Sequence, residues 1–282
     1  MTYYPSPVPE NTEDLRRYIN DELQRIRDSF GEIEENMSFN MLDISKGKPG
    51  HTYVNKFGRN SDVDTGTRAD IWDGGTPAIG GEVYTYSTTA DITHLVSSAA
   101  DTVDIEVTGL DANWLEVVQT QTLTGTTAVA LDTPLIRVYR MKNTTGTAAT
   151  GVIQCGVGTT TTSFSAANLR AQITLDYEQS LMSIYTVPAN KTAYLTNFWA
   201  DMNRNVTSGA ANIDVLARSF GGVFRVQTTS ASVGAGTSHF QHNYEPYPKY
   251  EGRTDIMMRA EASANNTDIS AGFDLILVQD GY

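Results

Sequence analysis

The sequence predicts a mainly β protein, in which an N-terminal coiled-coil-like helix is followed by antiparallel β-sandwich or jelly-roll modules. Two observations indicate this class. From Val83 onward, short runs of β-branched and aromatic residues recur about every ten residues, and Gly, Asn and Asp turns separate them. Ahead of these runs, one strongly charged segment carries apolar residues at alternating intervals of four and three.

The distribution of Gly, Pro and other turn-forming residues divides the chain into four segments. We expect an extended arm and oligomerisation helix over residues 1–40, a loop linker rich in Gly and Asp over 41–82, a first β-sandwich over 83–180 and a second over 181–282. A single large jelly roll spanning both halves is the alternative, because strand spacing alone does not distinguish the two.

The first ten residues have the composition of an arm. Pro5, Pro7 and Pro9 alternate with other residues and favour an extended conformation over helix or ladder. Tyr3 and Tyr4 are typical of packed interfaces. The arm either docks on a neighbouring subunit or has no fixed structure of its own, and we interpret it as an attachment arm.

A helix is expected from about residue 11 to residue 37. Its apolar residues form a narrow heptad stripe: Ile19, Leu23, Ile26, Phe30, Ile33 and Met37. A helix packed on its own domain usually has a wider apolar face, so the stripe favours a homo-oligomer, with a trimer preferred because a bulky Phe occupies a core position. A single helix lying along the β region remains the alternative.

Composition excludes several classes of function. The 282 residues include 33 acidic and 20 basic side chains, a formal net charge of −13, which argues against binding to nucleic acid. The only cysteine, Cys155, allows no intrachain disulfide and suits a reducing cytoplasm. No leader-like N-terminal stretch and no apolar run of membrane-spanning length is present, so we expect neither secretion by that route nor a membrane partner.

No catalytic motif is found in the sequence. The four histidines have no metal-ligand spacing, and neither a nucleophile elbow nor a phosphate loop occurs. We therefore expect no enzymatic activity, no catalytic residue and no cofactor. The most site-like stretch contains four aspartates, Asp62, Asp64, Asp70 and Asp73. Such a cluster suits either a bound calcium ion or ordinary turns, and we expect turns without a bound metal.

Three stretches resemble a family of structural proteins of marine tailed bacteriophages. They are NKFGRNSDVDTGTRADIWDGG (55–75), LMSIYTVPAN (181–190) and AEASANNTDISAGFDLILV (260–278). The resemblance extends over about residues 50–282. It implies a virion component that is assembled in the host cytoplasm, has no catalytic residues and has other virion proteins of the tail or capsid as partners.

Within such a particle, an arm followed by a coiled coil suits a tail- or fibre-associated protein. The alternatives are a capsid head decoration protein and a carbohydrate- or receptor-binding module that meets a host surface glycan. Six aromatic residues would then offer stacking faces: Trp72, Trp114, Trp199, Tyr244, Tyr247 and Tyr250. Burial in a core or an interface is the competing interpretation of the same residues.

Overall fold

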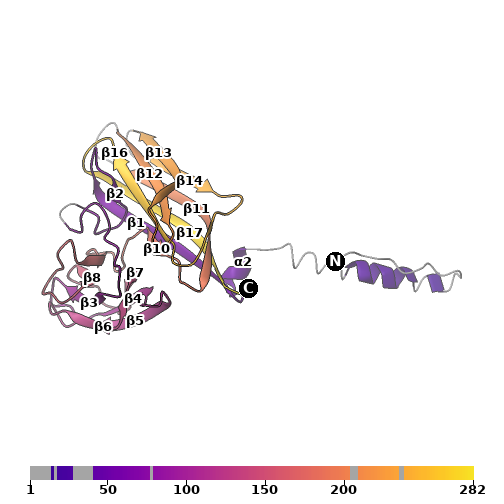
Figure 1. Ribbon diagram of the computed structural model, residues 1–282, viewed down its shortest axis with the longest axis horizontal. Coiled ribbons are helices and arrows are strands. Elements are labelled where there is room, and N and C mark those ends of the chain that lie inside the picture. Colours follow the sequence, from indigo (N-terminus) through magenta and orange to yellow (C-terminus); the bar gives the residue numbers. More distant parts are fainter. Residues whose placement is uncertain (1–13, 16–17, 28–40, 77–78, 204–208, 235–237) are drawn as a thin grey trace. The chain divides into compact units, whose positions relative to one another are not determined.

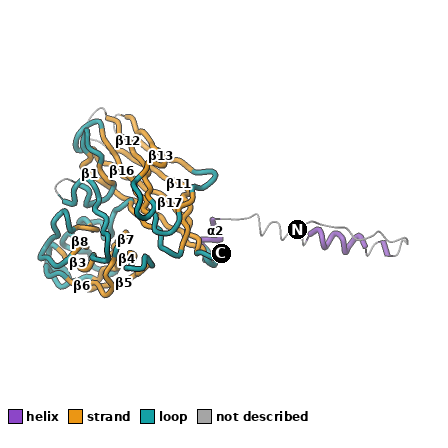
Figure 2. The backbone as a smooth tube through the Cα atoms, in the orientation of Figure 1, coloured by secondary structure: helices purple, strands orange, loops and turns teal. Residues whose placement is uncertain are grey.

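The computed structural model describes residues 14–15, 18–27, 41–76, 79–203, 209–234 and 238–282. The chain divides into two units, Met1–Pro49 and Gly50–Tyr282. The described part of the first unit is helical at residues 14–15 and 18–27, and in the short helix α2 (Met41–Ser45). The second unit consists of strands and the loops between them, as Figure 2 shows.

Seven consecutive strands of the second unit form a compact module. They are β3 (Ile92–Ser97), β4 (Asp104–Leu110), β5 (Glu116–Thr122), β6 (Val129–Leu135), β7 (Arg137–Asn143), β8 (Ile153–Val157) and β9 (Leu169–Ile173). One sheet has the order β6-β3-β8-β9 and the other β5-β4-β7. Inward residues of both sheets, such as Leu95 and Val107, share one apolar core. We call this module the inserted sandwich.

The remaining strands form a second sandwich around another apolar cluster, to which the inserted sandwich adds Leu110, Trp114, Ile136 and Tyr139. They are β1 (His51–Val63), β2 (Ala69–Asp70), β10 (Ile184–Thr186), β11 (Lys191–Asn203), β12 (Gly209–Arg218), β13 (Arg225–Gly234), β14 (Ser238–Asn243), β15 (Lys249–Tyr250), β16 (Asp255–Ala262) and β17 (Thr267–Gln279). One sheet has the order β1-β17-β11-β14, with β15 beside β11, and the other β10-β16-β12-β13, with β2 beside β16. We call this module the main sandwich.

The chain therefore enters the main sandwich through β1 and β2, leaves it to build the inserted sandwich, and returns at β10 (Figure 1). All ladders between named strands are antiparallel. The predicted mainly β, antiparallel sandwich class is confirmed. The described part of this unit holds two sandwiches, each with its own main apolar cluster and each adding residues to the cluster of the other. The coiled coil stays a prediction.

The predicted loop linker over 41–82 is wrong for residues 51–63, which form the thirteen-residue strand β1. The strand signal is masked because polar and small residues occupy its inward positions: Lys56 and Asn60 are buried, and Gly58 lies between them. A Cβ at Gly58 would lie 2.4 Å from the carbonyl oxygen of Ile71 and 2.4 Å from the amide of Ser183. Close backbone approach thus requires glycine where an apolar residue would have revealed the strand.

The boundary near residue 180 agrees with the chain's return to the main sandwich, but residues 181–282 do not complete that sandwich by themselves. Strand β1 pairs along its length with β17, from His51 opposite Val278 to Val63 opposite Thr267. Residues 83–88, where the first predicted sandwich was expected to begin, form irregular structure. The amide of Tyr84 and the carbonyl oxygen of Ser87 bond to side chains that are described next.

Candidate functional site

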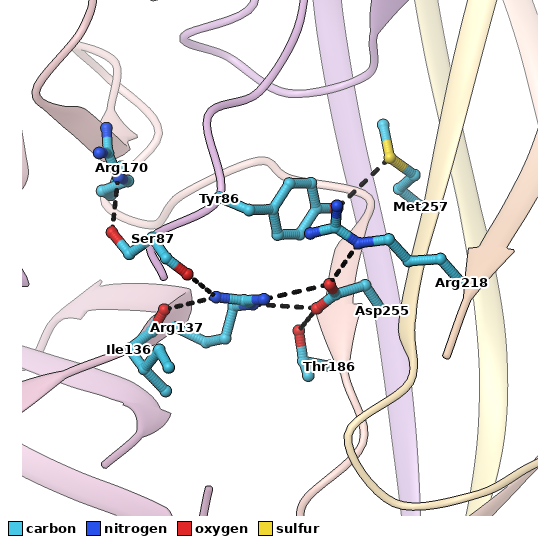
Figure 3. Close-up of polar contacts among 9 residues, drawn as sticks. All are labelled: Tyr86, Ser87, Ile136, Arg137, Arg170, Thr186, Arg218, Asp255 and Met257. Atoms are coloured by element: carbon cyan, nitrogen blue, oxygen red, sulfur yellow. Dashed lines mark hydrogen bonds and ion pairs between the residues drawn. The ribbon is translucent and has the colours of Figure 1, made fainter. Parts of the chain in front are cut away.

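A cleft of about 510 Å³ lies between the two sandwiches and is the candidate functional site. Its lining comes from both modules and from the irregular segment that joins them: Val83, Tyr84, Tyr86, Ser87, Thr88, Trp114, Arg137, Arg218, Phe220, Gly221, Gly222, Phe224, Asp255 and Arg259. Figure 3 shows the polar groups on its floor, where Arg137 and Arg218 meet at Asp255. Guanidinium groups and aromatic rings dominate the lining.

The pairing of three neighbouring strands determines which side chains form the centre of the cleft floor. Asp255 opens β16 and is the direct cross-strand neighbour of Thr186 in β10 and of Arg218 at the end of β12. Side chains at one rung of adjacent strands share a face of the sheet, so these three groups converge. Thr186 Oγ1 donates to Asp255 Oδ1 at 2.5 Å, and Arg218 Nε donates to Asp255 Oδ2 at 2.8 Å.

Arg137 completes the cluster from the inserted sandwich, at the first position of β7. Its Nε and Nη2 donate to the two oxygens of Asp255 at 2.9 and 3.1 Å, with side-chain exposures of 6% and 3% for the two partners. Its Nη1 donates to the carbonyl oxygens of Ser87 (2.6 Å) and Ile136 (2.8 Å). The buried charges are paired and hydrogen-bonded, as they must be to remain ionised away from water.

Two further arginines extend this polar floor. Arg170 Nε donates to Ser87 Oγ at 3.0 Å. Arg259 Nε donates to Asp70 Oδ1 at 2.5 Å, and the amide of Tyr84 donates to Asp70 Oδ2 at 2.7 Å. Burial raises the pKa of Asp70, while the bonds from Arg259 and the Tyr84 amide act in the opposite direction. The irregular segment 83–88 is thus fixed to both sandwiches by side-chain bonds.

Aromatic rings cover the guanidinium groups. The Arg218 guanidinium carbon lies 4.4 Å from the ring centroid of Tyr86 and 4.4 Å from that of Phe224. Arg137 lies 4.8 Å from the ring of Trp114 and 5.0 Å from that of Tyr86. Burial raises the pKa of Tyr86, so its hydroxyl stays protonated and donates to Met257 Sδ at 3.3 Å. Guanidinium planes stack well on such faces.

Trp114 is held in an uncommon backbone conformation, with φ at +64°. Oδ1 of Asp111 accepts from the amides of Asn113 (2.8 Å) and Leu115 (2.9 Å), and the Asp111 carbonyl accepts from the Trp114 amide (2.9 Å). A left-handed non-glycine residue costs on the order of 1–3 kcal/mol. This turn places the indole against Arg137 and against Phe220, whose ring centroid is 5.1 Å away.

The four aspartates singled out in the sequence do not converge. Asp70 pairs with Arg259, Asp73 Oδ2 accepts from the Thr174 amide at 3.3 Å, and Asp64 accepts from the Asn266 amide. Within the described ranges, no group of three or more His, Cys, Asp or Glu side chains is arranged to hold a metal ion. The arginines near this stretch also pair elsewhere: Arg59 with Asp268, and Arg68 with Asp214 and Glu261.

The predicted oligomer interface lies only partly within the described residues. Ile19 and Leu23 are 46% and 55% exposed, and Ile26 is half-buried. Three members of the stripe, Phe30, Ile33 and Met37, lie outside the described residues, as do all five residues named for the arm: Tyr3, Tyr4, Pro5, Pro7 and Pro9.

Among the aromatic residues considered for stacking, Trp114 alone lines the cleft. Trp72 is buried at 1% exposure and packs edge-on against Tyr84, with ring centroids 5.3 Å apart. Cys155 is buried as expected of an inert thiol, and burial raises its pKa to about 12. The residues of the cleft floor were not found by sequence reasoning; the only available signal was a charged side chain inside an apolar run, as in Leu135–Tyr139 around Arg137.

No helix within the described part of the chain is long and apolar enough to cross a membrane. No protein-family model matches the sequence, and no curated protein does. Among solved structures, TmCBM61 in complex with beta-1,4-galactotriose aligns at 14% identity and a TM-score of 0.20, over 36% of this chain and 63% of its own. The chain thus spans just under two thirds of that structure.

Two virus structures also align. Naturally occurring empty particles of Cowpea mosaic virus give 7% identity and a TM-score of 0.22, over 71% of this chain and 85% of theirs. The Gx strain of infectious bursal disease virus gives 10% identity and a TM-score of 0.24, over 82% and 73%. At these TM-scores none of the three similarities carries an argument about what this chain binds or assembles with.

Proposed function

We propose that this chain is a non-enzymatic structural component of a tailed-bacteriophage virion, associated with the tail or its fibres. It is attached through its N-terminal arm and helix. The helix joins the chains into a homo-oligomer, for which a trimer is favoured. The proposal rests on the resemblance of residues 50–282 to phage structural proteins and on one structural observation. Ile19 and Leu23, successive positions of the heptad stripe, are about half exposed on a helix whose other side chains are mostly polar or charged.

Exposed apolar side chains at heptad spacing are best covered by the same stripe of a second copy. Several copies held together would also raise the effective concentration of their arms. Each weak contact between an arm and the particle then adds to the others, and a large interface per copy is unnecessary.

The chemistry of the titratable groups supports a non-enzymatic role. Asp255 accepts bonds from Arg137, Arg218 and Thr186, so both of its oxygens are already engaged in hydrogen bonds within the fold. The thiol of Cys155 is buried, and its pKa of about 12 disfavours the nucleophilic thiolate. Neither Asp255 nor Cys155 is therefore suited to act as a catalytic base or nucleophile.

The molar mass of the full-length protein tests the oligomer. We expect light scattering to give about three times the chain mass of 30.8 kDa. Replacing both Ile19 and Leu23 by Asp should lower the mass, because it places charges in an apolar seam. The matched control replaces Asn20 and Gln24 by Asp: it adds two charges at the same spacing on the same helix, off the stripe, and should leave the mass unchanged. A monomeric wild type, or equal masses for the two variants, would contradict the proposal.

Attachment is tested separately with a chain that lacks residues 1–10. We expect it to melt at the wild-type temperature, since a segment with three prolines and few sizeable apolar side chains has little to add to a core, and to be missing from purified particles. Full incorporation of the shortened chain would show that the arm is not the tether. Activity on host polysaccharide that depends on a carboxylate of this chain would overturn the non-enzymatic role.

A further inference from the structure

We propose that the cleft between the two sandwiches binds a sugar that carries a carboxylate, such as a hexuronic acid, and that Arg218 is the residue that receives the carboxylate. This binding site goes beyond the structural role proposed above and does not depend on it. Three features of the cleft support it: a preorganised donor pair, a local excess of positive charge and an exposed phenylalanine ring beside other aromatic residues.

Arg218 presents two donor nitrogens that the protein itself does not use, Nη1 and Nη2. Its Nε is bonded to Asp255, and the rings of Tyr86 and Phe224, whose centroids are 5.4 Å apart, each lie 4.4 Å from its guanidinium carbon. Neither Nη1 nor Nη2 has a hydrogen-bond partner among the described residues, and the side chain is 25% exposed. A guanidinium held by one ion pair and two ring contacts has little rotamer freedom left to lose, so binding a planar carboxylate on its remaining edge costs little further entropy.

Charge favours an anion in this cleft. Three guanidinium groups line it, those of Arg137, Arg218 and Arg259. Arg259 is paired with Asp70, whereas Arg137 and Arg218 share the one carboxylate of Asp255, so the cluster has one positive charge in excess. The chain as a whole carries −13, so the lining is an exception to the acidic composition. Asp255 is already shared between two arginines and cannot neutralise both, which leaves positive potential at the mouth of a partly enclosed site.

The walls suit a sugar ring. Phe220 is 62% exposed beside the indole of Trp114, with 5.1 Å between ring centroids, and Val83 is 53% exposed on the joining segment. The volume of about 510 Å³ falls in the range of small-molecule sites, roughly 300–1,000 Å³. Aromatic faces bind the apolar C–H face of a pyranose, while the guanidinium edge supplies the directional polar contact. A free carboxylate without a sugar ring would make only the contact with the guanidinium edge.

The test compares ligands that differ by one group. Methyl glycosides of glucuronic and galacturonic acid, and the corresponding methyl glycosides of glucose and galactose, are titrated against the full-length protein at low ionic strength. Calorimetry or ligand-observed NMR measures binding. We expect at least one uronide to bind about ten-fold or more tightly than its neutral parent, because a charge-assisted hydrogen-bond pair is lost with the carboxylate. Acetate and N-acetylglutamate should bind more weakly than the uronide.

Variants assign the binding to the cleft. Arg218→Gln should weaken uronide binding by about ten-fold or more, whereas Arg225→Gln, at an exposed position of β13 outside the cleft, should not change it. If the loss of Arg218 unfolds the protein, Phe220→Ala gives the same test at a largely exposed residue and should weaken the uronide without weakening acetate. Binding of neither uronide, equal binding of uronide and acetate, or no effect of Arg218→Gln in a folded variant would each overturn the proposal.

Discussion

Replacing Asp255 by Asn is expected to destabilise the second unit much more than the same change at a partly exposed ion pair. Asp255 accepts from Arg137 and Arg218 with only 3% of its side chain exposed. Asn keeps the shape and removes the charge, so two guanidinium groups lose their counter-ion in a site that water reaches poorly. Breaking a buried pair in this way costs about 3–5 kcal/mol. For a unit of this size, this corresponds to a fall of roughly 6–20 °C in melting temperature.

The chain supplies a matched control in Arg59 and Asp268. This pair has the same two-bond geometry, with Nε and Nη2 donating at 2.8 and 2.7 Å, but its side chains are 36% and 23% exposed. Asp268→Asn should therefore cost only about 0–1 kcal/mol. Urea unfolding followed by tryptophan fluorescence compares the two variants at equal denaturant slope. If both variants lose the same free energy of unfolding, burial of the Asp255 pair does not determine its contribution and the reasoning is refuted.

Two further predictions concern buried titratable groups. Burial raises the pKa of Asp73 to about 8; the residue is partly exposed, but its Oδ1 is enclosed without a hydrogen-bond partner. From about pH 4 to about pH 8 the unfolded carboxyl is ionised and the folded one is not, so stability should fall as pH rises, by up to roughly 1.4 kcal/mol per pH unit. Asp73→Asn should remove this slope in urea unfolding, and a slope unchanged by the variant would contradict the assignment. Cys155 should resist a thiol reagent in the native protein and react fully in guanidinium chloride; rapid labelling of the native protein would show that the thiol is accessible.

The sequence pattern alone predicts a strand where the strand has one apolar and one polar face, or a clear turn at each end. Among the runs that follow Val83, Asp104–Leu110 alternates between buried and partly exposed residues and forms β4. Strand β6 is hard to detect in the sequence because Asp132 and Pro134 interrupt it. It is the edge strand of its sheet, where proline is tolerated.

The cleft could not be predicted because its members are brought together only by tertiary structure. Tyr86, Arg137, Arg218 and Asp255 lie in four separate segments, and the register of β12 with β16 brings the last two together. The insertion of one sandwich into the other then adds the first two. A charged residue inside an apolar run indicates a buried partner, but the sequence does not say which of the many acidic residues that partner is.

The pairing of β1 with β17 has a consequence for the order in which the protein can form during synthesis. Asn55 in β1 bonds to Asp274 in β17, 219 residues further along the chain. The inserted sandwich has all its strands once residue 173 has been made, whereas β1 has no partner until β17 emerges. Long-range pairing of this kind slows folding. Until β17 is made, the unpaired edge of β1 is a place where two incomplete chains can associate. A nascent chain interrupted before β17 would therefore carry one finished sandwich and one exposed strand prone to aggregation.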